Sequence, residues 1–327
     1  MITGKKIVFI SPAFFGIEKI VVDKLRKNNN IVYYFDERPF RSAIKKAINT
    51  IFPKAFLRSS DKYYKNEFSK CSFSPDIILI VKGEQVSKKT IELIREMYPK
   101  ARLMLYLWDA VTCVKGIADK IPLYDKVLSF DRLDCIKYNL VFRPLFCDNE
   151  SLQTIGQNQE YDLCFYGTMH TDRFSVLTRV NNIANELGLK VAEHCYLPSR
   201  FMCFYYWITN KGYRKFNKGL LSFKSKSQAE ISAMIENSRV ILDINDRKQS
   251  GLTIRTLESL FARRKIITTN KDIINYDFYD EEDVLIIDRD NVEMPASFFE
   301  KNNLRRDLDN KIRHKYSAEG WIEDVFQ

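Results

Sequence analysis

The chain has 327 residues, which is long for one domain and sufficient for two. Its 45% hydrophobic and 29% charged residues are typical of a soluble globular protein, and no apolar run approaches the about 20 residues that a membrane-spanning helix needs. A formal net charge of +10 favours an anionic partner.

Cysteine and histidine are distributed in a way that argues against a metal centre. The seven cysteines are scattered without a close-spaced pair, and several fall in apolar segments. The three histidines lack the spacing of zinc ligands. The sequence starts with a few residues that lead directly into a strand, without a signal-peptide cleavage region. We therefore expect no metal, no cofactor and a location in the reducing cytoplasm.

Strands and helices alternate along the first half of the chain. Continuous apolar runs predict strands at 7–10, 31–35, 76–81, 102–107 and 126–129. Amphipathic helices are expected at 17–26 and 88–98. Apolar strands separated by helices indicate parallel strands that are covered on both faces. A polar stretch at 148–160 is the best candidate for a linker.

The second half repeats this alternation. Five strands are expected, near Tyr161, Lys190, Val240, Lys265 and Val284. The first of them runs into a Gly/Thr-rich turn at 167–173, and a helix begins directly after it. Two closing helices are expected at 304–316 and 321–326.

The stretch from 240 to 270 reads as a strand, a polar loop, an amphipathic helix at 251–262 and a second strand. We expect the N–H groups at Gly251 to Thr253 to form an anion site at the start of this helix. Arg255 adds a planar bidentate donor for a phosphate, and Glu258 lies three residues later on the same helical face. The alternative is an Arg–Glu pair on an ordinary surface helix.

Taken in order, these segments resemble GT-B glycosyltransferases, and within them the bacterial capsule and lipopolysaccharide biosynthesis proteins related to the spore-maturation CgeB family. The resemblance is carried by 105–109, 124–131, 142–146, the turn Gly167–Arg173 and the helix Gly251–Ala262. It implies an α/β protein with two Rossmann-like domains whose parallel sheets face a central cleft. Residues 1–155 would form the acceptor domain and 156–300 the nucleotide-sugar domain. Residues 301–327 would form helices that cross back to the first domain.

The resemblance also implies roles for individual residues. Glu258 would bind the ribose of the donor. Diphosphate contacts would come from Gly167, Thr168, Arg173, Gly251, Thr253 and Arg255. The GT-B pattern places a second glutamate eight residues before the ribose-binding one, and here that position is Ser250. This departure weakens an assignment as a retaining transferase.

Three residues are candidates for proton transfer. Asp109 and Glu84 each follow a strand of the first domain, and Asp109 is the stronger candidate for the base that activates an acceptor hydroxyl. The alternative for Asp109 is that it caps the helix after it. His170 could transfer a proton or hold a phosphate oxygen. Two Asp-x-Asp patterns, at 288–290 and 307–309, are interpreted as solvated carboxylates.

Two stretches concentrate the positive charge. Residues 38–65 combine cations with apolar residues at helical spacing, which fits either a membrane-facing helix or an ordinary helix with a solvated basic face. Residues 200–226 combine basic residues with large aromatics and contain no acidic residue. Such a stretch favours an anionic membrane surface or the acceptor side of the site. Nucleic acid would also fit, but the sequence carries no nucleic-acid-binding motif, so none is expected.

The sequence therefore predicts a metal-independent glycosyltransferase. It would move a sugar from a nucleotide-diphosphate sugar to a lipid-linked glycan at the inner face of the cytoplasmic membrane. A non-hydrolysing nucleotide-sugar epimerase has the same two-domain architecture and is the alternative enzyme. A non-catalytic protein that binds sugar nucleotides or nucleic acid is the alternative from another class.

Overall fold

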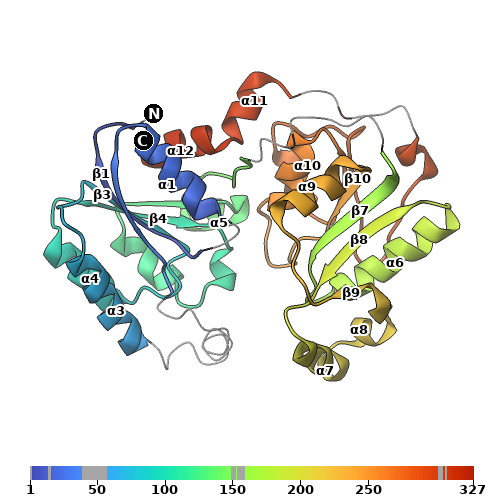
Figure 1. Ribbon diagram of the computed structural model, residues 1–327, viewed down its shortest axis with the longest axis horizontal. Helices are drawn as coiled ribbons and strands as arrows, with labels where there is room; N and C mark the ends of the chain where they lie inside the picture. The colour runs from blue at the N-terminus through green and yellow to red at the C-terminus, as the bar shows by residue number, and fades with distance from the viewer. Residues whose placement is uncertain are drawn as a thin grey trace. The chain divides into compact units, whose positions relative to one another are not determined.

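The computed structural model describes residues 2–13, 16–38, 57–148, 152, 159–300, 305 and 308–327, and the chain forms two compact units (Figure 1). Unit 1 comprises Met1–Leu145 and Ser317–Gln327, and unit 2 comprises Phe146–Tyr316. Most of the basic stretch at 38–65 and of the linker at 148–160 lies outside the described residues.

Unit 1 is built on a parallel six-stranded sheet with the order β2-β1-β3-β4-β5-β6. Its strands are β1 (Lys6–Ile10), β2 (Ile31–Phe35), β3 (Ile77–Val81), β4 (Arg102–Leu107), β5 (Lys126–Ser129) and β6 (Val141–Phe142). Its helices are α1 (Ile17–Lys27), α3 (Leu57–Ser69), α4 (Lys88–Met97), α5 (Arg132–Tyr138) and α12 (Ala318–Phe326). All residues of β3 are buried, as a strand covered on both faces requires.

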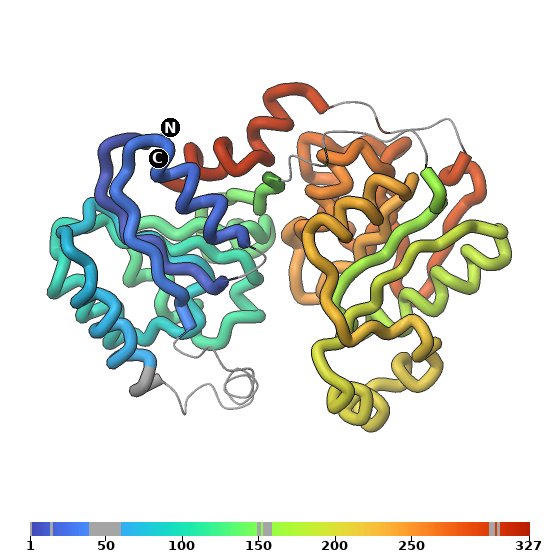
Figure 2. The backbone as a smooth tube through the Cα atoms, in the orientation of Figure 1, coloured from blue at the N-terminus to red at the C-terminus, as the bar shows by residue number. Residues whose placement is uncertain are grey.

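Helices cover both faces of this sheet because successive strand residues point to opposite sides. One face buries Ile78, Ile80 and Leu105 in a core shared with residues of α3 and α4. On the other face, the ring of Tyr106 meets Trp321 of α12 edge-on, with centroids 4.8 Å apart. Figure 2 shows the last helix running beside α1 within this unit.

Unit 2 has a second parallel six-stranded sheet, with the order β12-β11-β10-β7-β8-β9. Its strands are β7 (Tyr161–Thr168), β8 (Val191–Tyr196), β9 (Leu221–Ser222), β10 (Ser238–Asp243), β11 (Lys265–Thr268) and β12 (Val284–Ile286). Its helices are α6 (Arg173–Glu186), α7 (Arg200–Thr209), α8 (Lys211–Lys215), α9 (Gln228–Glu236), α10 (Ile254–Phe261) and α11 (Asn310–Lys315). Figure 1 shows α6 on one face of this sheet and α9 and α10 on the other.

The strands expected in both sheets are present, as are the helices expected at 17–26, at 88–98 and after the turn at 167–173. The last helix begins at Ala318 and not at residue 321, and of the helix expected at 304–316 the described helical part is Asn310–Lys315. The two-residue edge strands β6 and β9 were not expected, since runs this short carry no periodicity. Helix α10 begins at Ile254 and not at Gly251, because Thr253 occupies the N-cap with extended backbone angles. Among the described residues, no helix is long and apolar enough to cross a bilayer.

Candidate functional site

The strand order of unit 2 marks where a ligand of this sheet would bind. The chain runs from β7 outward through β8 and β9, then returns to the other side of β7 to form β10. The order therefore reverses between β7 and β10. Open α/β sheets bind ligands at the carboxyl ends of the strands beside such a reversal. Here these ends are Thr168 and Asp243.

Helix α10 is fixed to the end of β10 by a buried carboxylate. Asp243 is fully buried and accepts hydrogen bonds from the hydroxyls of Thr253 and Thr256, both at 2.9 Å. The Thr253 hydroxyl also accepts from the backbone N–H of Thr256 and so caps the helix. The N–H groups at the helix start therefore belong to Ile254 and Arg255. Gly251 therefore lies before the helix and not in its first turn as expected, and its contact with a phosphate stays a prediction.

Arg255 lies in this first turn, and its guanidinium is buried but only partly hydrogen-bonded. The residue is 8% exposed, and its Nη1 donates a long bond of 3.4 Å to the carbonyl oxygen of Tyr166. Its Nε is 3.4 Å from Asp243 Oδ1, yet it has no aligned hydrogen-bond acceptor among the described residues. A Cβ added at Gly167 would lie 3.1 Å from Nη1, so a glycine there leaves room for the guanidinium. Burial of a cation with this few partners favours an anionic ligand.

A second arginine joins the ends of the same two strands. Arg173, the first residue of α6, donates from Nε to the carbonyl of Ile244 at 2.9 Å. Its Nη1 donates to the carbonyl of Thr168 at 2.7 Å. Burial, and then the neighbouring charge of Arg255, lower the pKa of Arg173 to about 9. Two repelling cations thus lie at the strand ends, and a diphosphate would relieve their repulsion.

His170 lies in the turn between β7 and α6, near the two arginines. Burial and the charge of Arg173 lower its pKa to about 4. The imidazole is therefore neutral at pH 7, and its Nδ1 is 3.1 Å from the Thr171 hydroxyl. A neutral imidazole can exchange one hydrogen bond with a phosphate oxygen but adds no positive charge.

Glu258 is buried one turn further along α10, and both of its oxygens already accept hydrogen bonds. Tyr166 Oη donates to Oε2 at 2.6 Å, and Gln228 Nε2 donates to Oε1 at 3.0 Å. Burial raises the pKa of Glu258. Each carboxylate oxygen can accept a second bond, so the ribose contact expected from the resemblance stays a prediction. The position of the second glutamate, Ser250, is also buried.

Arg289 extends the basic cluster, although no motif in the sequence pointed to it. This residue follows β12 and donates to Asp172 Oδ2 at 3.0 Å and to the carbonyl of Asn245 at 2.7 Å. Arg247 donates to the same carboxylate of Asp172 at 2.6 Å. Arg289 thus connects the N-cap of α6 to the end of β10. The signal that could have found it is an arginine placed directly after a strand of the same parallel sheet.

The two candidate bases of unit 1 share one lysine. Lys82 Nζ lies 3.1 Å from Glu84 Oε2 and 3.2 Å from Asp109 Oδ2. Burial would lower the pKa of Lys82, but Asp109 and Glu84 outweigh it and raise the pKa. The short helical turn after Asp109 has Ala110 at its N-cap, so Asp109 does not occupy the capping position that the alternative required.

A buried carboxylate lies close to this group. Glu37 is 1% exposed and accepts from the backbone N–H of Gln85 at 2.8 Å, whereas its Oε2 has no partner among the described residues. Burial raises the pKa of Glu37 to about 7. Lys120 is buried nearby and donates to the carbonyls of Gly83 and Val86 at 2.6 and 2.7 Å. Burial lowers the pKa of Lys120 to about 8.

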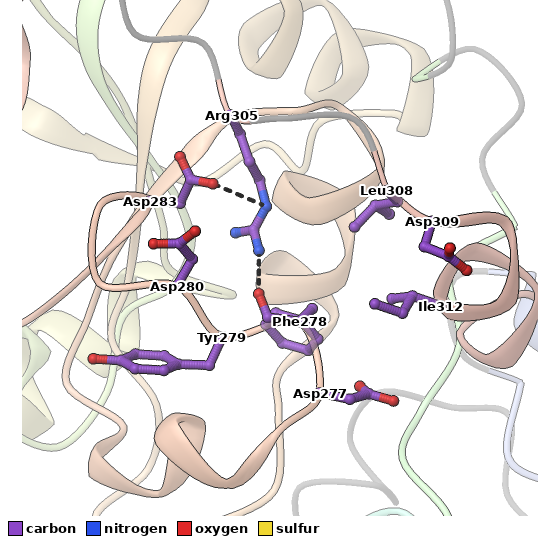
Figure 3. Close-up of a pocket in the computed structure, with 9 residues that line it drawn as sticks. All are labelled: Asp277, Phe278, Tyr279, Asp280, Asp283, Arg305, Leu308, Asp309 and Ile312. Carbon is purple, nitrogen blue, oxygen red and sulfur yellow. Dashed lines mark hydrogen bonds and ion pairs between the residues drawn. The ribbon is translucent and has the colours of Figure 1, made fainter.

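A separate hollow in unit 2 has a volume of about 210 Å³. Figure 3 shows the residues that line it. Several carboxylates line it together with Arg305, which is already paired with Asp283 and donates to the carbonyl of Phe278 at 2.6 Å. None of the predicted site residues lines this hollow. Within the described ranges, no group of three or more His, Cys, Asp or Glu side chains is placed to hold a metal ion.

Solved structures with a similar fold identify the fold of this chain. Neither a protein-family model nor a curated protein matches the chain. Among solved structures, the catalytic domain of Arabidopsis thaliana starch synthase IV, bound to ADP and acarbose, is 9% identical, with 88% of each chain covered and a TM-score of 0.52. HepE of Anabaena in complex with UDP-glucose is 8% identical over 99% of this chain and 96% of its own, with a TM-score of 0.51. The chain has the GT-B fold.

The GT-B fold confirms the expected fold class of two Rossmann-like domains with parallel sheets. Identities below 10% in these structures carry no information on the reaction. The CgeB-related subgroup stays a resemblance. The roles of the individual residues stay predictions, although the structure brings Gly167, Thr168, Arg173 and Arg255 to one edge of one sheet.

Proposed function

We propose that the chain is a glycosyltransferase that takes its sugar from a nucleoside diphosphate sugar. The observation that carries the proposal is the pair of buried cations, Arg173 and Arg255, at the carboxyl ends of β7 and β10. Both are bound to carbonyls of the same strand, and Arg255 retains an N–H without an aligned acceptor. Two arginines match the charge and the geometry of a diphosphate.

The fold supports the choice of donor. HepE is described in complex with UDP-glucose, and starch synthase IV bound to ADP and acarbose. A nucleotide bound in unit 2 with its diphosphate on the two arginines would use the ligand position typical of an open α/β sheet. Sugars linked to uridine diphosphate or to adenosine diphosphate are therefore the first donors to test.

The chemistry follows from this arrangement. An acceptor hydroxyl oxygen forms a bond to the anomeric carbon of the sugar, and the bond from that carbon to the diphosphate oxygen breaks. The electron pair leaves with the diphosphate, where Arg173 and Arg255 stabilise the additional charge without the need for a metal ion. The hydroxyl proton goes to a carboxylate, for which Asp109 ranks above Glu84. Lys82 holds both carboxylates in place.

The acceptor we propose is a lipid-linked glycan of the cell surface, handled at the inner face of the cytoplasmic membrane. This part rests on the resemblance to capsule and lipopolysaccharide biosynthesis proteins. The net charge of +10 supports it, because anionic lipids attract a basic protein.

A screen with radiolabelled nucleotide sugars tests the proposal. A donor that binds the native state raises the melting temperature by mass action, which identifies the donor first. The purified chain is then incubated with that donor and a bacterial lipid extract. We expect label in the organic phase and release of nucleoside diphosphate only when the extract is present. Conversion of the donor sugar without extract would instead indicate the epimerase, and binding without any turnover would indicate a binding protein.

A further inference from the structure

Helix α7 (Arg200–Thr209) exposes large apolar side chains that a globular protein normally buries. Its inner face packs Met202, Cys203 and Tyr206 against the core of unit 2, where the Tyr206 ring meets Phe174 at 5.1 Å. The outer residues are Phe201, Phe204, Tyr205, Trp207 and Ile208, exposed by 74, 61, 49, 58 and 55%. Exposed apolar side chains that gather on one face mark an interaction surface.

The spacing shows that these residues share one helical face. Residues 201, 204, 205 and 208 follow the i, i+3, i+4, i+7 pattern of an amphipathic stripe, and Trp207 lies three residues after Phe204. Phe223, which is 40% exposed, lies under the guanidinium of Arg200 at 5.5 Å. Figures 1 and 2 show α7 and α8 together at the β9 side of unit 2.

The segment that contains this helix carries charge of one sign. The sequence from 200 to 226 contains no acidic residue. Its cations are Arg200, Lys211, Arg214, Lys215, Lys218, Lys224 and Lys226. Of these, only Lys226 pairs with a carboxylate in the described part of the chain, that of Glu230 at 3.7 Å. The surface therefore combines an apolar stripe with uncompensated positive charge.

We propose that the outer face of α7, together with the cations of α8 and the loop up to 226, docks on an anionic lipid bilayer. An interfacial helix places its apolar stripe at the headgroup boundary, with Trp and Tyr at the level where they are enriched. The surrounding lysines and arginines are attracted by acidic headgroups. This lipid surface deepens the proposed function, since it brings the chain to a lipid-linked acceptor, but docking itself does not require sugar transfer.

Charge decides against a second copy of the chain as the occupant. In a two-fold dimer the same patch meets itself, which would oppose two sets of cations and no anions. The phosphates of a nucleic acid would pair with the cations, and its bases could stack on the aromatic rings. Stacking gives no role to the aliphatic side chain of Ile208 in the same stripe. A bilayer satisfies both the apolar stripe and the charge.

Vesicle cosedimentation of the full chain tests the inference. Vesicles of phosphatidylcholine alone are compared with vesicles that contain about one third phosphatidylglycerol, at low and at moderate salt. We expect binding only to the anionic vesicles, weakened by salt because charges are screened over about 8–10 Å. Removing one cation should lower the partition coefficient about fivefold. A variant with Gln at four positions should therefore have a partition coefficient at least a hundredfold lower. These positions are Lys211, Arg214, Lys215 and Lys218.

The apolar stripe is tested separately. An exposed-face variant, Phe201→Ser, Trp207→Ser and Ile208→Ser, should bind at least tenfold more weakly. Its matched control changes three exposed apolar residues elsewhere and should bind like the wild type: Leu133→Ser, Ile136→Ser and Ile274→Ser. The charge control is a fourfold Gln variant at exposed lysines of unit 1: Lys5, Lys88, Lys89 and Lys100.

Several outcomes would overturn the inference. One is equal binding by the exposed-face variant and the wild type. Another is a wild-type protein that binds neutral vesicles as well as anionic ones, or that binds neither kind. Tighter binding to single-stranded RNA than to anionic vesicles would assign the surface to nucleic acid, and a wild-type dimer that the Ser variant dissociates would assign it to a second copy. Turnover of the identified donor with a soluble acceptor is measured in parallel. Loss of docking with retained turnover separates this inference from the proposed function.

Discussion

Replacing Arg255 with glutamine should weaken nucleoside diphosphate binding without unfolding the protein. Arg255 is 8% exposed and retains an Nε–H without an aligned hydrogen-bond acceptor, so a phosphate would meet a largely desolvated donor. A hydrogen bond to a charged group contributes about 1.5–3 kcal/mol. The dissociation constant should therefore rise about tenfold to a hundredfold.

The structure also indicates why the fold should survive. Asp243 loses its ion pair with Arg255 but keeps the hydroxyl bonds from Thr253 and Thr256. Arg173 should even hold its proton more firmly, because the charge of Arg255 contributes to its lowered pKa. Part of the anion affinity should thus remain. Isothermal titration calorimetry with a nucleoside diphosphate and with inorganic pyrophosphate measures the loss of affinity. The affinity for both ligands should fall to a similar extent.

Arg239→Gln is the matched control. Arg239 lies near the amino end of the same strand, β10, and pairs with Asp162 at 3.0 Å. This amino end of the strand is far from the proposed phosphates at the carboxyl end, so the variant should bind the nucleotide like the wild type. Unchanged affinity in Arg255→Gln, or an equal loss of affinity in both variants, would show that Arg255 does not bind the diphosphate.

Three further predictions address other carboxylates. If Glu258 binds the ribose, Glu258→Gln should weaken binding of the nucleoside diphosphate about tenfold in calorimetry and leave pyrophosphate binding unchanged. An equal change in affinity for the two ligands would refute that role. Asp109→Asn should lower the turnover rate by about a hundredfold or more and Glu84→Gln by less, and the reverse order in a product-release assay would exchange their roles. Folding raises the pKa of Glu37 from 4.5 to about 7, so its contribution to stability is present below pH 4.5 and is lost as pH rises through 7. Glu37→Gln should therefore raise the free energy of unfolding in urea by about 3 kcal/mol at pH 8 and by far less at pH 5, whereas a gain independent of pH would contradict the assignment.

Much of the fold follows from the pattern of apolar residues. Strands such as β3 and β4 are continuous apolar runs because helices cover both of their faces, so their bounds are visible in the sequence. The edge strands β6 and β9 have two residues each and depend on a neighbouring strand, which no local pattern reports. The start of α10 was misplaced because Gly251 and Thr253 both fit a helix entrance. The hydroxyl bond from Thr253 to Asp243, ten residues earlier, decides between them.

The candidate site shows the same limit. The position of Arg173 and Arg255 at helix starts after strands could be predicted, since each follows its strand closely in the sequence. The partners of Glu258 could not, because Tyr166 and Gln228 come from β7 and α9 and meet it only in the folded unit. The contact of Arg289 with Asp172 likewise joins residues 117 positions apart. Lys82 between Glu84 and Asp109 depends on the pairing of β3 with β4.

A crystal structure with a bound nucleoside diphosphate would show directly whether the two arginines bind the donor. We expect diphosphate oxygens within hydrogen-bond distance of Arg173 and Arg255, at the carboxyl ends of β7 and β10. In crystals of Arg255→Gln grown at the same ligand concentration, the diphosphate density should disappear. A nucleotide bound at the hollow beside Arg305, or anywhere else away from these strand ends, would contradict it.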